Sequence, residues 1–145
     1  MKRILLFIKN YALYLAFLQA VAASVGSLYF SQVLGYQPCP LCWWQRIFMY
    51  PLTILFAQAL IRKEKVIAYY ALPLAVIGAV VAIYHYLLQM GTLADITPVS
   101  CSVLAPCAQT QVLYFGFITI PLLSFAAFLI IVILMLALVS KNSKK

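Results

Sequence analysis

The sequence predicts an all-α integral membrane protein, a bundle of four helices with both termini in the cytoplasm. Three observations support this class: 67% of the 145 residues are apolar, only 8% are charged, and the basic residues gather in three clusters. Soluble domains are ~45–50% apolar and ~25% charged, so a soluble globular domain is excluded. Disordered chains need low hydrophobicity, so disorder is excluded as well. The length predicts one domain over residues 1–145.

Four long apolar stretches predict four membrane-spanning helices. They lie at about residues 11–34, 43–61, 66–90 and 112–139. Each is long enough to cross ~30 Å of hydrocarbon as a helix, and none alternates as a barrel strand does. The first stretch follows a basic start, but it is too long for a signal peptide. Pro51, Pro73 and Pro121 fall inside the last three spans, where each is expected to kink its helix.

The distribution of basic residues predicts the orientation of the bundle. Nine of the ten Lys and Arg residues lie before the first span, between the second and third, or after the fourth. The positive-inside rule places these segments in the cytoplasm, so the loops at about 35–42 and 91–111 face outward. No basic face is interleaved with aromatic residues, and we expect no nucleic-acid partner. The lipid bilayer of the plasma membrane is the predicted surrounding.

The four cysteines form two close pairs, Cys39 with Cys42 and Cys101 with Cys107, in or beside the predicted outer loops. The outer side of a cell membrane is oxidising, and disulfides persist there. A zinc site made of all four cysteines is an alternative. The oxidising location disfavours that alternative, so the sequence predicts a redox centre and no metal.

The first pair belongs to the segment Cys39-Pro-Leu-Cys42, at the predicted start of the second span. A helix N-terminus carries partial positive charge, which stabilises a thiolate, the nucleophile of disulfide exchange. Arg46 follows Cys42 by four residues and therefore shares its helix face. The guanidinium could simply snorkel to the membrane surface. We favour a role in which Arg46 lowers the pKa of the Cys42 thiol and donates hydrogen bonds to a bound acceptor.

The second pair and the end of the third span supply the other candidate residues. Only five residues separate Cys101 from Cys107, and constrained, exposed disulfides tend to be labile and catalytic; a static loop staple is the alternative. His85 and Gln89 share one face of the third span. An ionisable residue inside a span indicates a functional site, although a hydrogen bond between helices would also explain it.

Together these residues resemble the DsbB family of membrane thiol–quinone oxidoreductases, in particular its short-loop, BdbC-like members. The likeness covers nearly the whole chain, with one cysteine pair in each outer loop and Gly116 and Pro121 leading into the fourth span. The residues similar to the family's functional positions are Cys39, Cys42, Arg46, His85, Gln89, Cys101 and Cys107. Better-known members have many more residues between the cysteines of the second loop.

The resemblance implies a protein-dithiol:quinone oxidoreductase. Such an enzyme re-oxidises an extracytoplasmic thioredoxin-fold thiol oxidase with its own Cys-x-x-Cys, and it passes the electrons to a membrane quinone, menaquinone or ubiquinone. It thereby supports disulfide formation in exported proteins.

The resemblance also implies a role for each cysteine. Cys101 forms the mixed disulfide with the partner, Cys107 resolves it and exchanges with Cys39, and Cys42 faces the quinone. Arg46 lies beside Cys42, and His85 and Gln89 are candidates for the quinone pocket.

Two alternative functions remain. A vitamin K epoxide reductase-like enzyme also pairs loop cysteines with a membrane Cys-x-x-Cys, but there the Cys-x-x-Cys comes late in the chain, and here it comes early. A non-enzymatic scaffold with disulfide-stapled loops is the second alternative. A transporter is disfavoured because the spans lack charged residues at mid-membrane.

Overall fold

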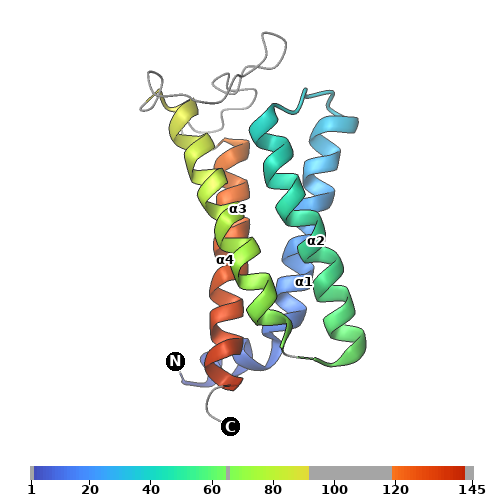
Figure 1. Ribbon diagram of the computed structural model, residues 1–145, viewed down its shortest axis with the longest axis vertical. Helices are drawn as coiled ribbons and strands as arrows, with labels where there is room; N and C mark the ends of the chain where they lie inside the picture. Colours follow the sequence, from blue (N-terminus) through green and yellow to red (C-terminus); the bar gives the residue numbers. More distant parts are fainter. Residues whose placement is uncertain (1, 65, 92–118, 143–145) are drawn as a thin grey trace.

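The computed structural model describes residues 2–64, 66–91 and 119–142, and their side chains from residue 11 to residue 140. It contains four helices, shown in Figure 1: α1 (Lys2–Gln32), α2 (Pro40–Arg62), α3 (Ile67–Gln89) and α4 (Ile120–Asn142). No strand occurs in the described residues. The predicted class, an all-α membrane bundle, is confirmed.

The four described helices form a closed ring of pairwise contacts. α1 packs against α2 and α4, and α3 packs against the same two helices, so that α2 and α4 lie on a diagonal. The start of α1, the end of α4 and the turn between α2 and α3 all lie at the lower end of the bundle in Figure 1. The α1–α2 loop lies at the opposite end. This places the predicted outer end of the bundle away from both termini.

Three of the four described helices are long and apolar enough to cross a membrane: Tyr11–Gln32, Ile67–Gln89 and Ile120–Ser140. The helix α2 has 23 residues, which is also sufficient length, but it carries Gln45, Arg46 and Gln58. Gln45 and Arg46 are buried, so their polar groups face the bundle rather than lipid. A crossing by α2 stays a prediction.

Two helix starts differ from the predicted spans. α1 is helical from Lys2, before the expected start near residue 11. α4 begins only at Ile120, and Thr119 before it is not helical; its carbonyl accepts from the Leu123 N–H at 3.1 Å. Pro121 therefore lies in the first turn, where its missing N–H removes no helical hydrogen bond. The kink predicted at Pro121 is wrong for that reason, whereas Pro51 and Pro73 do lie inside their helices.

The core depends on small side chains that let the helices approach closely. Fully buried alanines recur along α1 and α3: Ala12, Ala16, Ala20, Ala68, Ala71, Ala75 and Ala82. Gly78 of α3 lies against the ring of Phe128 of α4, closely enough that a Cβ at this position would overlap the ring. Small residues at such positions are typical of membrane helix contacts. Gly78 therefore allows a close contact between α3 and α4, whereas an added Cβ at Gly26 would meet open space.

We therefore expect Gly78→Ala to lower the stability of the protein, although alanine is the better helix former by ~1 kcal/mol. Overpacking costs ~1–3 kcal/mol, and Phe128 is fully buried and has little room to move. The melting temperature of the helical circular dichroism signal in detergent measures this change. Gly26→Ala is the matched control, because nothing lies within 4 Å of its added Cβ. A Gly78→Ala protein that melts as high as this control would contradict the close contact.

Candidate active site

The Cys39–Cys42 pair lies at the start of α2, at the end of the bundle away from the termini. Cys39 is the N-cap residue with φ −70° and ψ 166°, and Pro40 fixes the first helical position. The Cys42 N–H donates to the Cys39 sulfur at 3.4 Å, as an N-cap side chain accepts from the third helical residue. Both thiols are free, and their sulfurs lie 3.0 Å apart. The local sequence thus folds the pair into a juxtaposed dithiol.

The approach to this pair is fixed by the end of α1. Gly35 adopts a left-handed conformation with φ 69°, which is accessible to glycine without strain. The Tyr36 N–H then donates to the Phe30 carbonyl at 3.1 Å, and the two rings stack at 6.3 Å between centroids. These contacts turn the chain back toward the bundle just before Cys39.

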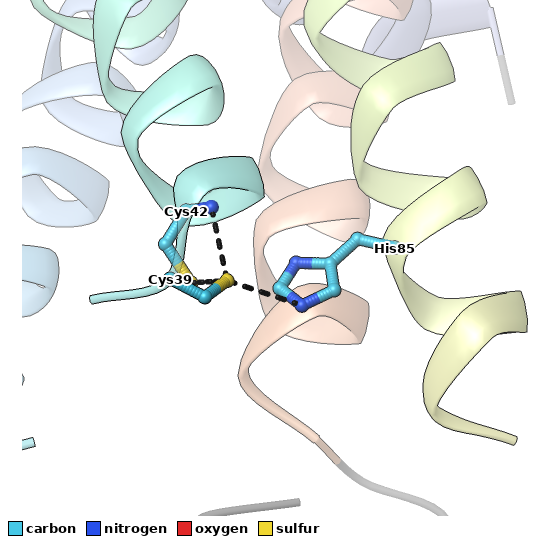
Figure 2. A group of neighbouring side chains, drawn as sticks. All are labelled: Cys39, Cys42 and His85. Atoms are coloured by element: carbon cyan, nitrogen blue, oxygen red, sulfur yellow. Dashed lines mark hydrogen bonds between the residues drawn. The ribbon is translucent and has the colours of Figure 1, made fainter. Parts of the chain in front are cut away.

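His85 of the neighbouring helix α3 faces the Cys39–Cys42 pair. Figure 2 shows its ring directed at Cys39, and the His85 Nε2 atom lies 3.6 Å from the Cys39 sulfur. Its Nδ1 atom lies 3.0 Å from Gln45 Nε2 on α2. An amide N–H from Gln45 to Nδ1 leaves the ring proton on Nε2, where it points at the sulfur. With only 1% of its surface exposed, His85 is a buried donor to Cys39.

The thiolate is favoured at Cys39, which lies just outside α2. The hydrogen bond from the Cys42 thiol lowers the pKa of Cys39 to about 4, burial opposes that effect, and the His85 imidazole adds to it. We expected the lowered pKa at Cys42, beside Arg46. The structure places it at Cys39 because two neighbouring thiols share one negative charge, and the sulfur that accepts hydrogen bonds keeps it.

A pH titration of the reduced protein tests this assignment. Because the pKa of Cys39 is lowered, its thiolate persists well below neutral pH and is lost only as the pH falls through about 4. The thiolate ultraviolet absorbance of a Cys101→Ser/Cys107→Ser protein should report one such titration. Cys42→Ala removes the largest cause and should move the midpoint toward the ordinary thiol range. A midpoint already in that range in the parent protein would contradict the assignment.

Arg46 is held inside the bundle rather than at its surface. Its side chain is 8% exposed, Nε donates to Ser27 Oγ at 2.9 Å, and Nη2 donates to the Ser27 carbonyl at 2.8 Å. The guanidinium carbon also lies 5.4 Å from the centre of the Trp43 ring, within the range of a cation–π contact. Ser27 on α1 and Trp43 on α2 therefore fix the guanidinium from two sides.

A cavity of about 340 Å³ opens beside the pair and is lined by residues of α1, α2 and α4. Its polar lining includes Cys42, Arg46 and Tyr50. The Tyr50 hydroxyl is buried and has no hydrogen-bond partner among the residues that the structure describes. The cavity lining therefore combines one cysteine, one cation and several hydroxyl-bearing residues, among them Tyr50 and serines of α1.

The structure brings together most of the predicted site residues, on two sides of the pair. Cys42 and Arg46 line the cavity, whereas His85 contacts Cys39. Gln89 lies one turn beyond His85 and does not line this cavity. Cys101 and Cys107 lie outside the described residues.

Three residues of this site were missed as site residues in the sequence. Ser27 accepts from Arg46, and no local pattern in the sequence indicates this contact. Gln45 follows Cys42 by three residues and so shares its helix face, which could have indicated a site role. Nothing in the sequence distinguishes Tyr50 from the aromatic residues around it.

Comparison with known proteins agrees with this site. The sequence matches the family described as Disulfide bond formation protein DsbB over residues 9–138. It is 41% identical to Disulfide bond formation protein C of Bacillus subtilis over 133 residues, which are 91% of this chain and 95% of that protein. It is 40% identical to Probable disulfide formation protein C 1 of Bacillus anthracis, over 86% of this chain and 89% of the relative.

A relative outside that genus is similar as well. A Probable disulfide formation protein of Coxiella burnetii is 45% identical, over 85% of this chain and 84% of the relative. No solved structure matches the chain. The predicted family is thereby confirmed: with a free Cys-x-x-Cys at the start of α2 and a match over most of its length, the chain belongs to the DsbB family of membrane disulfide-forming oxidoreductases.

Proposed function

We propose that this protein is a protein-dithiol:quinone oxidoreductase of the plasma membrane. It re-oxidises an extracytoplasmic thioredoxin-fold thiol oxidase through that protein's Cys-x-x-Cys, and it passes the electrons to a membrane quinone. One observation carries the proposal. Cys42 and Arg46 line the same cavity, and the Cys39 sulfur lies 3.0 Å from the Cys42 sulfur. A dithiol in contact with a ligand cavity can pass electrons to a molecule bound there.

The residues of the cavity fit a quinone. Its volume of about 340 Å³ falls in the ~300–1,000 Å³ range of ligand sites, which are mostly apolar with a few placed polar groups. A quinone ring has two carbonyl oxygens that accept hydrogen bonds. Arg46 has five N–H donors and gives two of its nitrogens to Ser27, and the Tyr50 hydroxyl is a further donor. When bound, a quinone supplies a two-electron, two-proton acceptor.

The cysteines would work as a relay in which each step exchanges one disulfide for another. The reduced partner gives two electrons to the Cys101–Cys107 disulfide and leaves as a disulfide. The resulting dithiol then reduces the Cys39–Cys42 disulfide. Finally the pair would give two electrons to a quinone bound in the cavity and become a disulfide again; one proton would come from the Cys42 thiol and the second from water, because Cys39 is already a thiolate. The Cys39 thiolate, 3.0 Å from the Cys42 sulfur, is placed to close that bond.

His85 and Gln89 would act from the Cys39 side of the pair. The His85 N–H stabilises the Cys39 thiolate while Cys42 remains directed toward the cavity. In this proposal His85 sets which sulfur carries the charge. Gln89 is the weaker candidate, one turn further along α3.

A single-turnover reaction tests the proposal. Reduced protein with Cys101→Ser and Cys107→Ser is mixed without oxygen with a soluble naphthoquinone or benzoquinone of the menaquinone or ubiquinone type. We expect one hydroquinone per chain, together with a Cys39–Cys42 disulfide detected by loss of alkylation. The faster of the two quinones identifies the acceptor class. A pair that is oxidised by a general thiol oxidant but by neither quinone would contradict the proposal.

A further inference from the structure

A third metal-ligating side chain stands beside the cysteine pair. The sulfurs of Cys39 and Cys42 and a ring nitrogen of His85 all lie within 4.8 Å of one another. Thiolate and imidazole are the preferred ligands of Zn²⁺. We propose that the reduced Cys39–Cys42 pair binds Zn²⁺ together with His85, and that the bound ion withdraws the dithiol from electron transfer. The second part of this inference rests on the proposed function, and the first does not.

The spacing of the three atoms is close to that of a zinc site. Zn–S bonds of ~2.3 Å and Zn–N bonds of ~2.0–2.1 Å in tetrahedral geometry place the ligand atoms ~3.5–3.8 Å apart. The Cys39 sulfur and His85 Nε2 are already 3.6 Å apart. The two sulfurs, at 3.0 Å, need to separate by ~0.7 Å. Rotation of the half-buried Cys42 side chain in the first turn of α2 provides that movement.

The residues around the three ligands supply a hydrogen-bond partner for the His85 ring and leave a fourth coordination position on the ion open. A metal-bound histidine donates its other ring N–H to an acceptor that orients the ring. Gln45 already lies 3.0 Å from His85 Nδ1, and a half-turn of its carboxamide presents the oxygen to an Nδ1–H. Because Cys42 lines the cavity, a fourth ligand such as water can reach the ion. Three protein ligands with one open position are a known zinc arrangement.

Charge and burial make the binding depend on the redox state. Cys39 is 5% exposed and His85 1% exposed, and buried charges are stable only when they are paired or coordinated to a metal. One Zn²⁺ with two thiolates is neutral, and its binding releases the remaining thiol proton, that of Cys42, without moving electrons. A Cys39–Cys42 disulfide has no thiolate to offer. The site therefore exists only in the reduced protein.

Binding is measured on the full chain with Cys101→Ser and Cys107→Ser, which removes the other cysteines as ligands. Competition with a chromophoric zinc chelator should show one Zn²⁺ per reduced chain and none in the oxidised chain. Losing a residue that only hydrogen-bonds to a metal ligand lowers metal affinity by ~10–100-fold. His85 is a proposed ligand itself, so His85→Ala should weaken zinc binding by at least that factor. Gln58→Ala, an exposed position on α2, is the control and should bind as the parent does.

Two further readouts avoid dependence on a variant that fails to fold. Zinc X-ray absorption of the reduced parent should show two sulfurs and an imidazole nitrogen around the ion. Equal binding by the reduced and oxidised protein, or an ion without sulfur ligands, would overturn the site. In turnover assays one equivalent of Zn²⁺ should block quinone reduction, and a chelator should restore it. Zinc-insensitive turnover would overturn the inhibition alone, whereas a protein that binds zinc but never reduces quinone would refute the proposed function and leave the site standing.

Discussion

Cys42→Ser is expected to abolish quinone reduction, with a fall in turnover of at least about 1,000-fold, as for loss of other essential nucleophiles. Serine cannot form a disulfide with Cys39, so the two electrons of the pair cannot be released by closing that bond. The initial rate of quinone reduction, driven by a reduced Cys-x-x-Cys partner, measures the effect. Because Cys42 is only half buried and serine is nearly the same size, the helical spectrum and melting temperature should remain those of the parent.

The control for this variant is Gln58→Ala, on the same helix but exposed and far along the chain from the pair. It should keep the parent turnover. Retention of partner-supported quinone reduction by Cys42→Ser would contradict the relay, because no route through Cys39 alone can release two electrons as a disulfide.

Arg46→Ala is expected to raise the KM for quinone by ~10–100-fold and to change the KM for the thiol partner little. Hydrogen bonds to charged groups contribute ~1.5–3 kcal/mol, and each ~1.4 kcal/mol is a factor of ten in affinity. Arg46→Lys keeps the charge but lacks the fork needed to bind Ser27 and a ligand together, so an intermediate KM is expected. Steady-state kinetics with each substrate varied in turn separate the two KM values.

Ser27→Ala tests whether the position of the guanidinium matters. It removes the hydroxyl that accepts from Arg46 Nε but leaves the backbone carbonyl that accepts from Nη2. Loss of one such bond costs ~1 kcal/mol, so a rise of a few-fold in the quinone KM is expected, in the same direction as Arg46→Ala. A change confined to the partner KM in either variant would contradict the placement of Arg46 at the quinone cavity.

The parts of the fold and site that depend on local sequence could be predicted. The apolar stretches give the helices, and the spacing of Cys39, Cys42 and Arg46 is set within one helix start, so the structure reproduces it directly. The start of α4 could not be located, because residues before Ile120 are as apolar as those after it and hydropathy does not distinguish them.

The contacts between helices could not be predicted from the sequence. Whether His85 faces the cavity or Cys39 depends on how α3 is rotated about its axis, and α3 is apolar on all sides, so no amphipathic pattern fixes that rotation. The same holds for Ser27, whose contact with Arg46 joins residues nineteen positions apart. Helix packing decides both contacts.

The most direct test of the relay is the redox state of the cysteines in intact membranes. Free thiols are trapped with a mass-tagged alkylating agent, first with the quinone pool replete and then with the pool depleted. The proposed function predicts a Cys39–Cys42 disulfide when quinone is present and an accumulation of free thiols at these residues when quinone is absent. If the fraction of free thiols is the same with and without quinone, the pair does not pass its electrons to quinone, and the proposed function is contradicted.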